Sequence, residues 1–455
     1  MNLIITYDLS FLVIFTLFVI IFLYSKRKNI AREGLLYLYK TQVGVKLIDY
    51  IGRKFGKQIR SLHYVIISIS YLLFAGIMFI IGQAIYIYLK VPEITSVIKT
   101  PPLLPLIPYF PQLFGAKNLF PPFYFVYFLA AIVIVAFVHE FSHGILAKAN
   151  NVRIKSTGVA FLGPILGAFV EQDEGQMKKQ KNVPQMAILG AGVFANTIIA
   201  LIFFILLLAS FKILFAPSGA IFASYSYGIV NISDVTNITN VSGSLLQLQT
   251  QNQNFLIDSD SLKLQLEKSE DTGFIVAYLD APAIRNNISG AITEVNGNEI
   301  KDLDGFIMGI EKYSPGNAVI IKTTKGEYNI NLGEHPENSS RAFLGVGFRN
   351  SRESQKFYTK IFFFKNPNVY YKPLTSFSVF IYDLLWWISI INIMVALFNM
   401  LPFGFLDGGR FFYLTVLGIT KSEKIAMKSY KIATKLVLIL FILLMIAWVI
   451  SFRSG

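Results

Sequence analysis

The sequence predicts a polytopic α-helical membrane protein of about six transmembrane helices, with a β-rich domain inserted into the chain. Of its 455 residues, 54% are hydrophobic, and the mean hydropathy is +0.55. The apolar residues gather in runs long enough to cross a bilayer, whereas a soluble core would need only short or alternating runs. Residues 217–372 differ, because short apolar stretches there are separated by Asn, Ser, Asp and Gly.

The charge distribution indicates how the chain enters the membrane. The net charge is +14, and a segment with a net charge of +8 lies between Lys26 and Arg60, where ten Lys and Arg face two acids. This segment follows a first apolar run over residues 8–24, as expected for the cytoplasmic side of an uncleaved membrane helix. The N-terminus is therefore predicted to lie outside, and no nucleic acid is expected as a partner.

The rest of the N-terminal region, residues 1–60, is amphipathic. From Leu35 to Ile59 the pattern places Ile48 and Ile51 on one side and basic residues such as Arg53 on the other. Two interpretations remain open. The segment could be a basic helix on the cytoplasmic membrane surface, or a juxtamembrane loop that follows the positive-inside rule.

Residues 61–216 are predicted to hold three more spans, over residues 63–89, 123–147 and 183–215. The prolines between residues 101 and 122 exclude a regular helix, and this apolar segment is expected to lie at the outer interface. The apolar segment Gly158–Gly167 is too short to span, so it is expected to form a hairpin or re-entrant loop covering the site described next.

The C-terminal region, residues 373–455, is predicted to hold the last two spans. These cover residues 374–401 and about 436–452, separated by a lysine-rich segment. With them, the six spans alternate consistently across the membrane.

An H-E-x-x-H motif occupies residues 139–143, inside the third predicted span. On a helix His139 and His143 face the same way, so both imidazoles can bind one metal ion while Glu140 acts on a bound water. The motif begins about 24 Å into the span, towards its cytoplasmic end. An ionisable side chain there costs about 2.5–3.5 kcal/mol, which metal binding would offset. The alternative is that the histidines form hydrogen bonds between helices.

A third metal ligand is expected to be a carboxylate, because the chain has no cysteine and only four histidines. The first candidate is Asp407, since Pro402 and Gly404 interrupt the fifth span and could aim this carboxylate inward. Asp407 could instead cap a helix or pair with Arg410. Glu171 is a rival ligand, although its polar surroundings are more typical of a solvated cytoplasmic loop.

Three features together resemble the site-2 protease family of intramembrane zinc metalloproteases. They are the His-Glu motif continuing to Gly144, the segment Asn399–Gly409 in a later span, and the external domain between them. The resemblance covers about residues 121–420. It implies a protease that cuts the transmembrane segments of other membrane proteins, after an earlier cut has shortened their external part.

The same resemblance implies roles for individual residues, around one zinc ion in a core of three transmembrane helices. Gly192–Asn196 in the fourth span is similar to the family's Gly-x-x-x-Asn motif, although these glycines equally indicate close helix packing. An asparagine amide there would bind the substrate backbone or the developing oxyanion. The implied zinc ligands are His139, His143 and Asp407, the catalytic residue is Glu140, and the substrate-binding residues are Asn196 and Asn399.

The external domain, residues 217–372, is similar to a PDZ domain from about residue 270 to 350. The matching segments are Gly273–Tyr278 and Ile292–Ile300, although Gly290-Ala291 replaces the usual Gly-Asp. Gly345–Phe348 could form a carboxylate-binding turn or a plain strand. PDZ domains bind extended peptides by adding a strand to a sheet edge, so the resemblance implies peptide binding or a size filter.

Five N-x-S/T sequons occur in this external region. They agree with an extracytoplasmic location and with N-glycosylation, although loops rich in Asn and Ser also produce sequons by chance. The sequons begin at Asn231, Asn237, Asn240, Asn287 and Asn338.

The sequence thus favours an intramembrane zinc endopeptidase, with membrane proteins as substrates and lipid as surroundings. The competing interpretation is a membrane protein that holds or transports a metal and recruits peptides through its external domain. Glu140 distinguishes the two, because hydrolysis requires a general base and metal holding does not.

Overall fold

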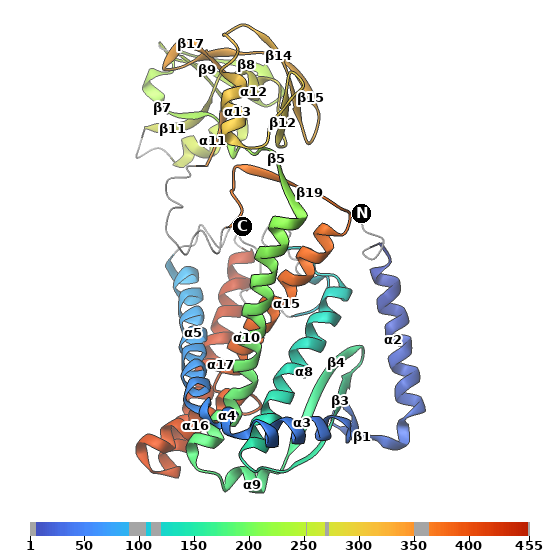
Figure 1. Cartoon of the computed structure of the whole chain (residues 1–455). Helices are drawn as coiled ribbons and strands as arrows, with labels where there is room; N and C mark the ends of the chain where they lie inside the picture. The colour runs from blue at the N-terminus through green and yellow to red at the C-terminus, as the bar shows by residue number, and fades with distance from the viewer. Residues whose placement is uncertain are drawn as a thin grey trace. The chain divides into compact units, whose positions relative to one another are not determined.

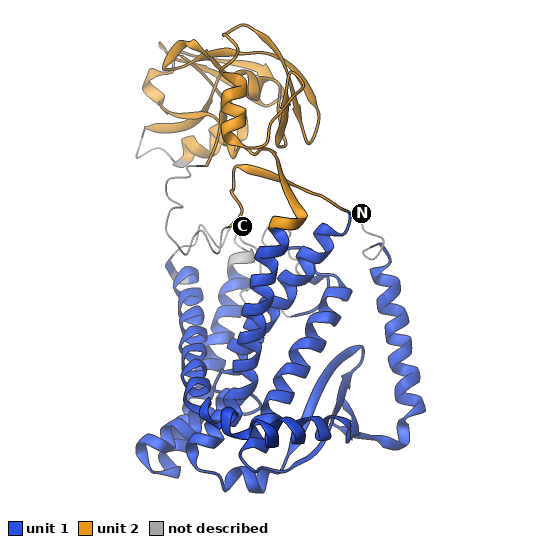
Figure 2. Ribbon diagram, viewed as in Figure 1, with its two compact units in different colours: residues 1–211, 376–455 blue, residues 212–375 orange. Residues whose placement is uncertain are grey.

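The computed structural model describes residues 6–90, 106–110, 120–251, 253–268, 273–349 and 364–453. The chain divides into two compact units, one of residues 1–211 and 376–455 and the other of residues 212–375 (Figure 2). The proline-rich segment predicted to lie at the outer interface falls mostly outside the described residues. Each unit is considered by itself below.

Among the described residues, the first unit contains six helices that are long and apolar enough to cross a membrane, as the sequence predicted (Figure 1). The last of them begins at Glu423 rather than near Leu436, because lysine is a good helix former and extends the helix beyond the apolar run. The six helices are α2 (Asp8–Ser25), α5 (His63–Lys90), α8 (Phe125–Ala149), α10 (Asn182–Leu214), α15 (Ser378–Asn399) and α17 (Glu423–Arg453).

The segment after α2 differs from both predicted forms, since it is neither one amphipathic helix nor a loop. Leu36–Thr41 contains Tyr and Thr residues, which favour strands, and it forms a strand. Only the following residues form helices, with Ile48 buried. The elements in order are η1 (Arg27–Asn29), β1 (Ile30–Glu33), β2 (Leu36–Thr41), α3 (Val43–Lys54) and α4 (Gly56–Ser61).

The apolar hairpin predicted between Gly158 and Gly167 is present and longer than expected. It consists of β3 (Ile154–Leu162) and β4 (Ile165–Gln172), which turn at Gly163 with φ of +59°. The strands form one antiparallel sheet in the order β1-β2-β3-β4. The short helix α9 (Glu174–Lys178) then leads into α10. In this sheet β4 is an edge strand, and it packs against α8.

Helix α8 is held at its N-terminal end by aromatic packing and by a carboxylate from another helix. Trp387 of α15 stacks on Phe123, with 4.0 Å between ring centroids, and its Nε1 donates to Pro122 O at 3.1 Å. The buried Asp8 at the start of α2 accepts from the backbone N–H of Phe125 at 2.8 Å and of Val126 at 2.9 Å. It also accepts from the Tyr109 hydroxyl.

Asp8 therefore does the work of an N-cap residue for α8. The residue in the N-cap position, Tyr124, makes no side-chain capping bond. A carboxylate suits the positive end of the helix dipole and satisfies amide groups that have no partner within the helix. Asp8 thus couples the first membrane helix to the helix that carries the H-E-x-x-H motif.

The second unit is rich in strands, and its core lies between sheets and short helices. One sheet has the order β7-β11-β10-β9-β8, another has the order β15-β14-β12-β5-β19, and β16-β17 and β18-β6 form two small pairs. Its elements are β5 (Phe215–Ala220), β6 (Ser224–Tyr225), β7 (Tyr227–Asn231), η3 (Ile232–Asp234), β8 (Asn237–Ser242), β9 (Leu245–Gln249), β10 (Asn254–Asp258), α11 (Ser259–Lys268), β11 (Phe274–Leu279), α12 (Pro282–Arg285), β12 (Ile292–Val295), β13 (Asn298–Glu299), α13 (Leu303–Ile310), β14 (Ala318–Thr323), β15 (Glu327–Asn331), β16 (Gly333–His335), β17 (Asn338–Phe343), β18 (Val346–Gly347) and β19 (Val369–Pro373).

The capping role of Asp8 can be tested by substitution. Asp8→Ala leaves two buried backbone N–H groups of α8 without their acceptor, so we expect the free energy of unfolding to fall by about 1–3 kcal/mol. Thermal unfolding of the purified chain in detergent measures the loss. Glu33→Gln, at an exposed position of β1, is the matched control and should leave the melting temperature unchanged. Equal melting temperatures for Asp8→Ala and wild type would contradict the capping role.

Candidate metal centre

The two histidines of the motif lie side by side on α8, as the helical spacing predicted. Both are buried, and their ring centroids are 4.7 Å apart. The two Nε2 atoms approach to 3.1 Å. Since their Nε2 lone pairs point to one place, the two imidazoles are arranged as a pair of ligands to a single ion.

Asp407 reaches the same place from another part of the chain. Helix α15 ends at Asn399, an irregular segment follows, and Asp407 is the first residue of α16 (Asp407–Thr420). Asp407 Oδ2 lies 3.1 Å from Nε2 of His139 and 3.2 Å from Nε2 of His143. Arg410, the other partner considered for this carboxylate, donates instead to Gln185 at 3.1 Å.

The interrupted backbone before Asp407 depends on two glycines. A Cβ on Gly408 would lie 2.2 Å from Met400 O, and one on Gly409 would lie 2.1 Å from Phe403 O. Both glycines are buried, so the first turn of α16 packs directly on the irregular segment. The Thr434 hydroxyl of α17 donates to Pro402 O at 2.5 Å, satisfying a carbonyl that a regular helix would have paired.

Helix α10 holds both imidazoles from their other side. His143 Nδ1–H donates to Ile188 O at 2.7 Å, which leaves Nε2 of His143 free to bind a metal. The side-chain amide nitrogen of Asn196 lies 3.1 Å from Nδ1 of His139. Between these residues, a Cβ on Gly192 would lie 2.5 Å from His143 Nε2 and 2.6 Å from His139 Cε1. Only glycine therefore allows α10 to approach the pair so closely.

The donor set fits zinc. The ligand atoms of His139, His143 and Asp407 all lie within 4.8 Å of one another. Two imidazole nitrogens and one carboxylate oxygen, with a fourth position open, form the usual ligand set of a catalytic zinc site. Asn196 Oδ1 is buried and has no hydrogen-bond partner among the described residues. If the Asn196 side-chain amide is rotated by 180°, Oδ1 accepts a hydrogen bond from Nδ1–H of His139. His139 carries its proton on Nδ1 when Nε2 binds a metal.

Glu140 follows His139 on α8 and contacts the hairpin. Its Oε2 accepts from the backbone N–H of Val170 in β4 at 3.2 Å, and the side chain is only partly buried. The carboxylate is thus held beside the two imidazoles by an amide of an edge strand. This contact fixes both the position of the predicted base and the distance between α8 and the hairpin.

The remaining candidates lie apart from the cluster or at its margin. Glu171 accepts from Lys40 at 2.9 Å and from Ser156 at 2.7 Å, and it is not part of the metal-binding group. These hydrogen bonds, with that from Lys40 the larger effect, lower the pKa of Glu171. Asn399 is half-buried at the last position of α15, next to the irregular segment.

Two groups that build the site were missed by sequence reasoning. The carbonyl of Ile188 and the amide of Val170 are backbone groups, so no side chain marks them in the sequence. Asp8 was also missed, although an acidic residue at the start of an apolar run is a visible signal of a buried partner.

Comparison with known proteins identifies a family and several relatives. The profile described as Peptidase family M50 matches residues 127–445. A protein of Clostridium perfringens named "Putative zinc metalloprotease CPE1693" is 24% identical over 355 residues, covering 66% of this chain and 90% of that protein. One of Fusobacterium nucleatum, named "Putative zinc metalloprotease FN1322", is 25% identical over 356 residues, covering 70% and 91%.

A third relative, from an archaeon, matches a shorter stretch. The uncharacterized protein MJ0971 of Methanocaldococcus jannaschii is 30% identical over 186 residues. The match covers 40% of this chain and 46% of that protein.

Substituting the two carboxylate candidates separately tests which one completes the metal site. Asp407→Ala removes an oxygen that lies within 3.2 Å of both imidazole Nε2 atoms, so we expect the zinc bound per chain to fall by at least about tenfold. Glu171→Ala is the matched control and should retain zinc, since the Glu171 carboxylate bonds to Lys40 and Ser156 among the described residues. Elemental analysis of the purified variants gives the result. Zinc loss from Glu171→Ala alone would reverse the assignment.

Proposed function

This chain belongs to peptidase family M50, the intramembrane zinc metalloproteases, and on that basis we propose how its residues cut a membrane-spanning substrate. The proposal rests on one observation: the ligand atoms of His139, His143 and Asp407 lie close together, beside Glu140. Zinc bound there would activate water and polarise the scissile carbonyl. The proposed zinc ligands are these two histidines and Asp407.

Glu140 is the proposed general base. It takes a proton from the attacking water and passes it to the leaving amine, which needs a carboxylate close to the metal ligands and free on one side. One oxygen, Oε2, accepts from Val170 N–H, and this single hydrogen bond leaves the carboxylate further lone pairs for water.

Asn196 and Asn399 are the proposed substrate-binding residues. The contact of Asn196 with His139 supports a second role, in which this amide orients the imidazole before any substrate arrives. Asn399 stands at the end of α15, where the helix gives way to irregular backbone that a substrate could approach. Amide donors at either position would suit the oxyanion that develops during peptide hydrolysis.

Strand β4 is the proposed docking edge for the substrate. A peptide bond inside a helix is hydrogen-bonded and shielded, so the substrate must unwind before it can be cut. In the antiparallel register Thr157 pairs with Val170, and the N–H of Val170 points away from β3 towards Glu140. Because outward-pointing groups alternate along a strand, Ala168 presents the next free edge position. A substrate strand bonded there would lie close to Glu140.

The external region is proposed to act on substrates before they reach this site. Its PDZ-like segment would bind peptide termini or exclude large external domains, so that an earlier cut must come first. Support comes from the sequence resemblance and from the strands β11 and β12, which overlap the two matching segments. Use of the sequons, the external location of this region and the cytoplasmic position of the catalytic site remain parts of the proposal.

Replacing the proposed base separates proteolysis from metal holding. Glu140→Gln should lower cleavage of a membrane-spanning reporter in liposomes by about 10²–10⁴-fold while zinc content stays at the wild-type level. Glu174→Gln, at an exposed position of α9, is the matched control. Cleavage by Glu140→Gln at the wild-type rate would favour the competing function, a membrane protein that holds or transports metal.

The docking edge can be tested through one backbone amide. Ala168→Pro removes an outward N–H of β4, so we expect kcat/KM for a membrane-spanning reporter to fall about tenfold, the effect of one lost hydrogen bond of roughly 1.4 kcal/mol. Ala168→Val keeps the amide and adds similar bulk, and it should cleave at the wild-type rate. Zinc content should be unchanged in both. If the two variants lose activity equally, side-chain bulk rather than strand addition explains the effect.

A further inference from the structure

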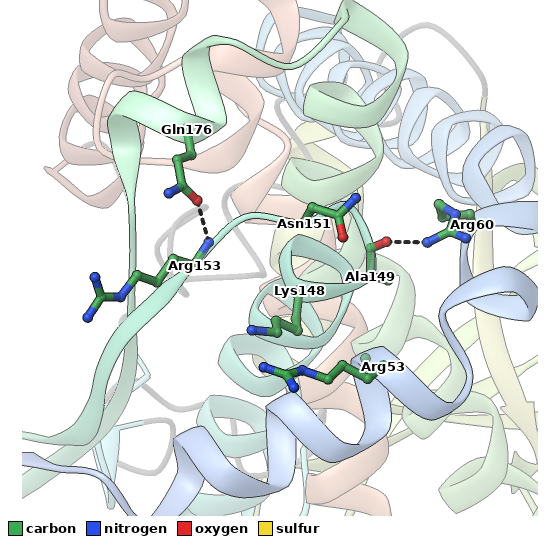
Figure 3. A pocket seen from close by; sticks show the side chains of 8 residues that line it. Arg53, Arg60, Lys148, Ala149, Asn151, Arg153 and Gln176 are labelled. Carbon is green, nitrogen blue, oxygen red and sulfur yellow. Dashed lines mark hydrogen bonds between the residues drawn. The ribbon is translucent and has the colours of Figure 1, made fainter.

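A basic pocket lies where the motif-bearing helix α8 ends. It has a volume of about 560 Å³, and its walls come from α3, α4, the last turn of α8, the segment after it, and α9. Among the described residues, four cationic side chains and no acidic one line it, namely Arg53, Arg60, Lys148 and Arg153. Figure 3 shows the charged ends of Arg53, Lys148 and Arg153 all pointing towards the left of the view.

Contacts between separate elements build this pocket. Arg60 Nη1 donates to Ala149 O at 2.5 Å, which ties α4 to the C-terminal end of α8. Gln176 Oε1 of α9 accepts from the backbone N–H of Arg153 at 2.8 Å. Helix α3 crosses α8 so closely that a Cβ on Gly52 would lie 2.7 Å from Lys148 Cβ. A merely basic surface would place its cations along one helix, whereas these come from four parts of the chain.

The neighbouring acids leave cationic donors free. Asp49 pairs with Lys148 at 2.8 Å and more weakly with Arg53 at 3.6 Å. Asp173 accepts from Gln176 N–H at 3.0 Å and so caps α9. The Arg53 side chain is 73% exposed, and a guanidinium has five N–H donors, of which one distant ion pair uses few. The pocket therefore keeps a positive charge that an anion can neutralise.

We propose that this pocket binds the phosphate group of an anionic phospholipid. Guanidinium groups match phosphate oxygens in a two-point geometry, and basic pockets between membrane helices are suited to lipid headgroups. The pocket lies at Ala149, the last residue of a membrane-spanning helix, which is the depth expected of headgroups. Free phosphate shares this chemistry, but it does not account for the apolar surface next to the pocket.

That apolar surface belongs to α3. Val43, Leu47 and Tyr50 recur at helical spacing and are 79%, 46% and 57% exposed, on the side opposite the buried Ile48. In Figure 1, α3 runs across the ends of the long helices rather than along them. An amphipathic helix in this orientation can place its apolar side chains among acyl chains while its basic residues meet the headgroup.

The pocket is also connected to the metal centre. Ala149 follows His143 on the same helix by six residues, about 9 Å at 1.5 Å per residue. A bound headgroup would hold α3, α4 and α9 together at the end of α8. The lipid would thus fix the position of the helix that carries both imidazoles.

The test measures lipid binding by the full chain, purified in detergent and stripped of native lipid. Fluorescent phosphatidylglycerol should bind more tightly than phosphatidylcholine of the same chain length. Arg53→Gln/Arg153→Gln should weaken phosphatidylglycerol binding about thirtyfold and leave phosphatidylcholine binding unchanged. Lys46→Gln/Lys57→Gln removes the same charge from exposed positions of α3 and α4 outside the pocket, so it is the matched control and should bind as wild type.

Three results would overturn the proposal. If phosphatidylglycerol binding weakens equally in both double variants, general surface charge rather than this pocket attracts the lipid. Inorganic phosphate that displaces the lipid at concentrations comparable with the lipid's own would make free phosphate the ligand. Unchanged binding in the single variant Arg153→Gln, whose exposed side chain can be replaced without disturbing the fold, would also contradict it, since about a fivefold loss is expected. Binding requires no proteolysis, so these results are independent of the proposed activity.

Discussion

The close approach of α10 to α8 at Gly192 is the contact on which the rest of the site depends. With no side chain at this position, α10 can bring the Ile188 carbonyl to Nδ1 of His143 and the Asn196 amide to Nδ1 of His139. These contacts turn both Nε2 atoms towards Asp407. Any larger residue at position 192 would occupy the space of the imidazoles themselves, so the Gly-x-x-x-Asn motif is a metal-site motif as much as a helix-packing one.

Irregular backbone inside a membrane must have its polar groups satisfied, and two hydrogen bonds contribute to this here. Gly408 and Gly409 let α16 begin directly against the interrupted end of α15, and Thr434 donates to Pro402 O. On the other side of the site, Glu140 accepts from the edge amide of Val170. These partners pair one carbonyl of the broken helix and one amide of the edge strand, which would be costly to leave unpaired beside an apolar bundle. The same irregularities expose the backbone that a substrate would need.

The sequence predicted the parts of this structure that depend on local patterns. Apolar runs placed the six helices, and helical spacing put His139 and His143 on one face. The scarcity of histidine predicted a carboxylate ligand, and the interrupted fifth span favoured Asp407 for that role. The prediction was wrong for Leu36–Thr41, where the sheet β1-β2-β3-β4 imposes a strand on a segment assigned to a basic helix or loop. That strand forms because β3 supplies a partner far along the chain, and no window of neighbouring residues contains this information.

Helix α8 is bound by a different charged residue at each end, and it carries the two metal-binding histidines between these ends. At its N-terminus Asp8 supplies a carboxylate to amide groups that need an acceptor, and at its C-terminus Arg60 supplies a cation to the carbonyl of Ala149. Both charges have the sign that the helix dipole favours. Because a helix moves as a rigid element, fixing its two ends from α2 and α4 also fixes the imidazoles between them. The positions of the two imidazoles therefore depend partly on residues at the two ends of the helix, well away from the reacting atoms.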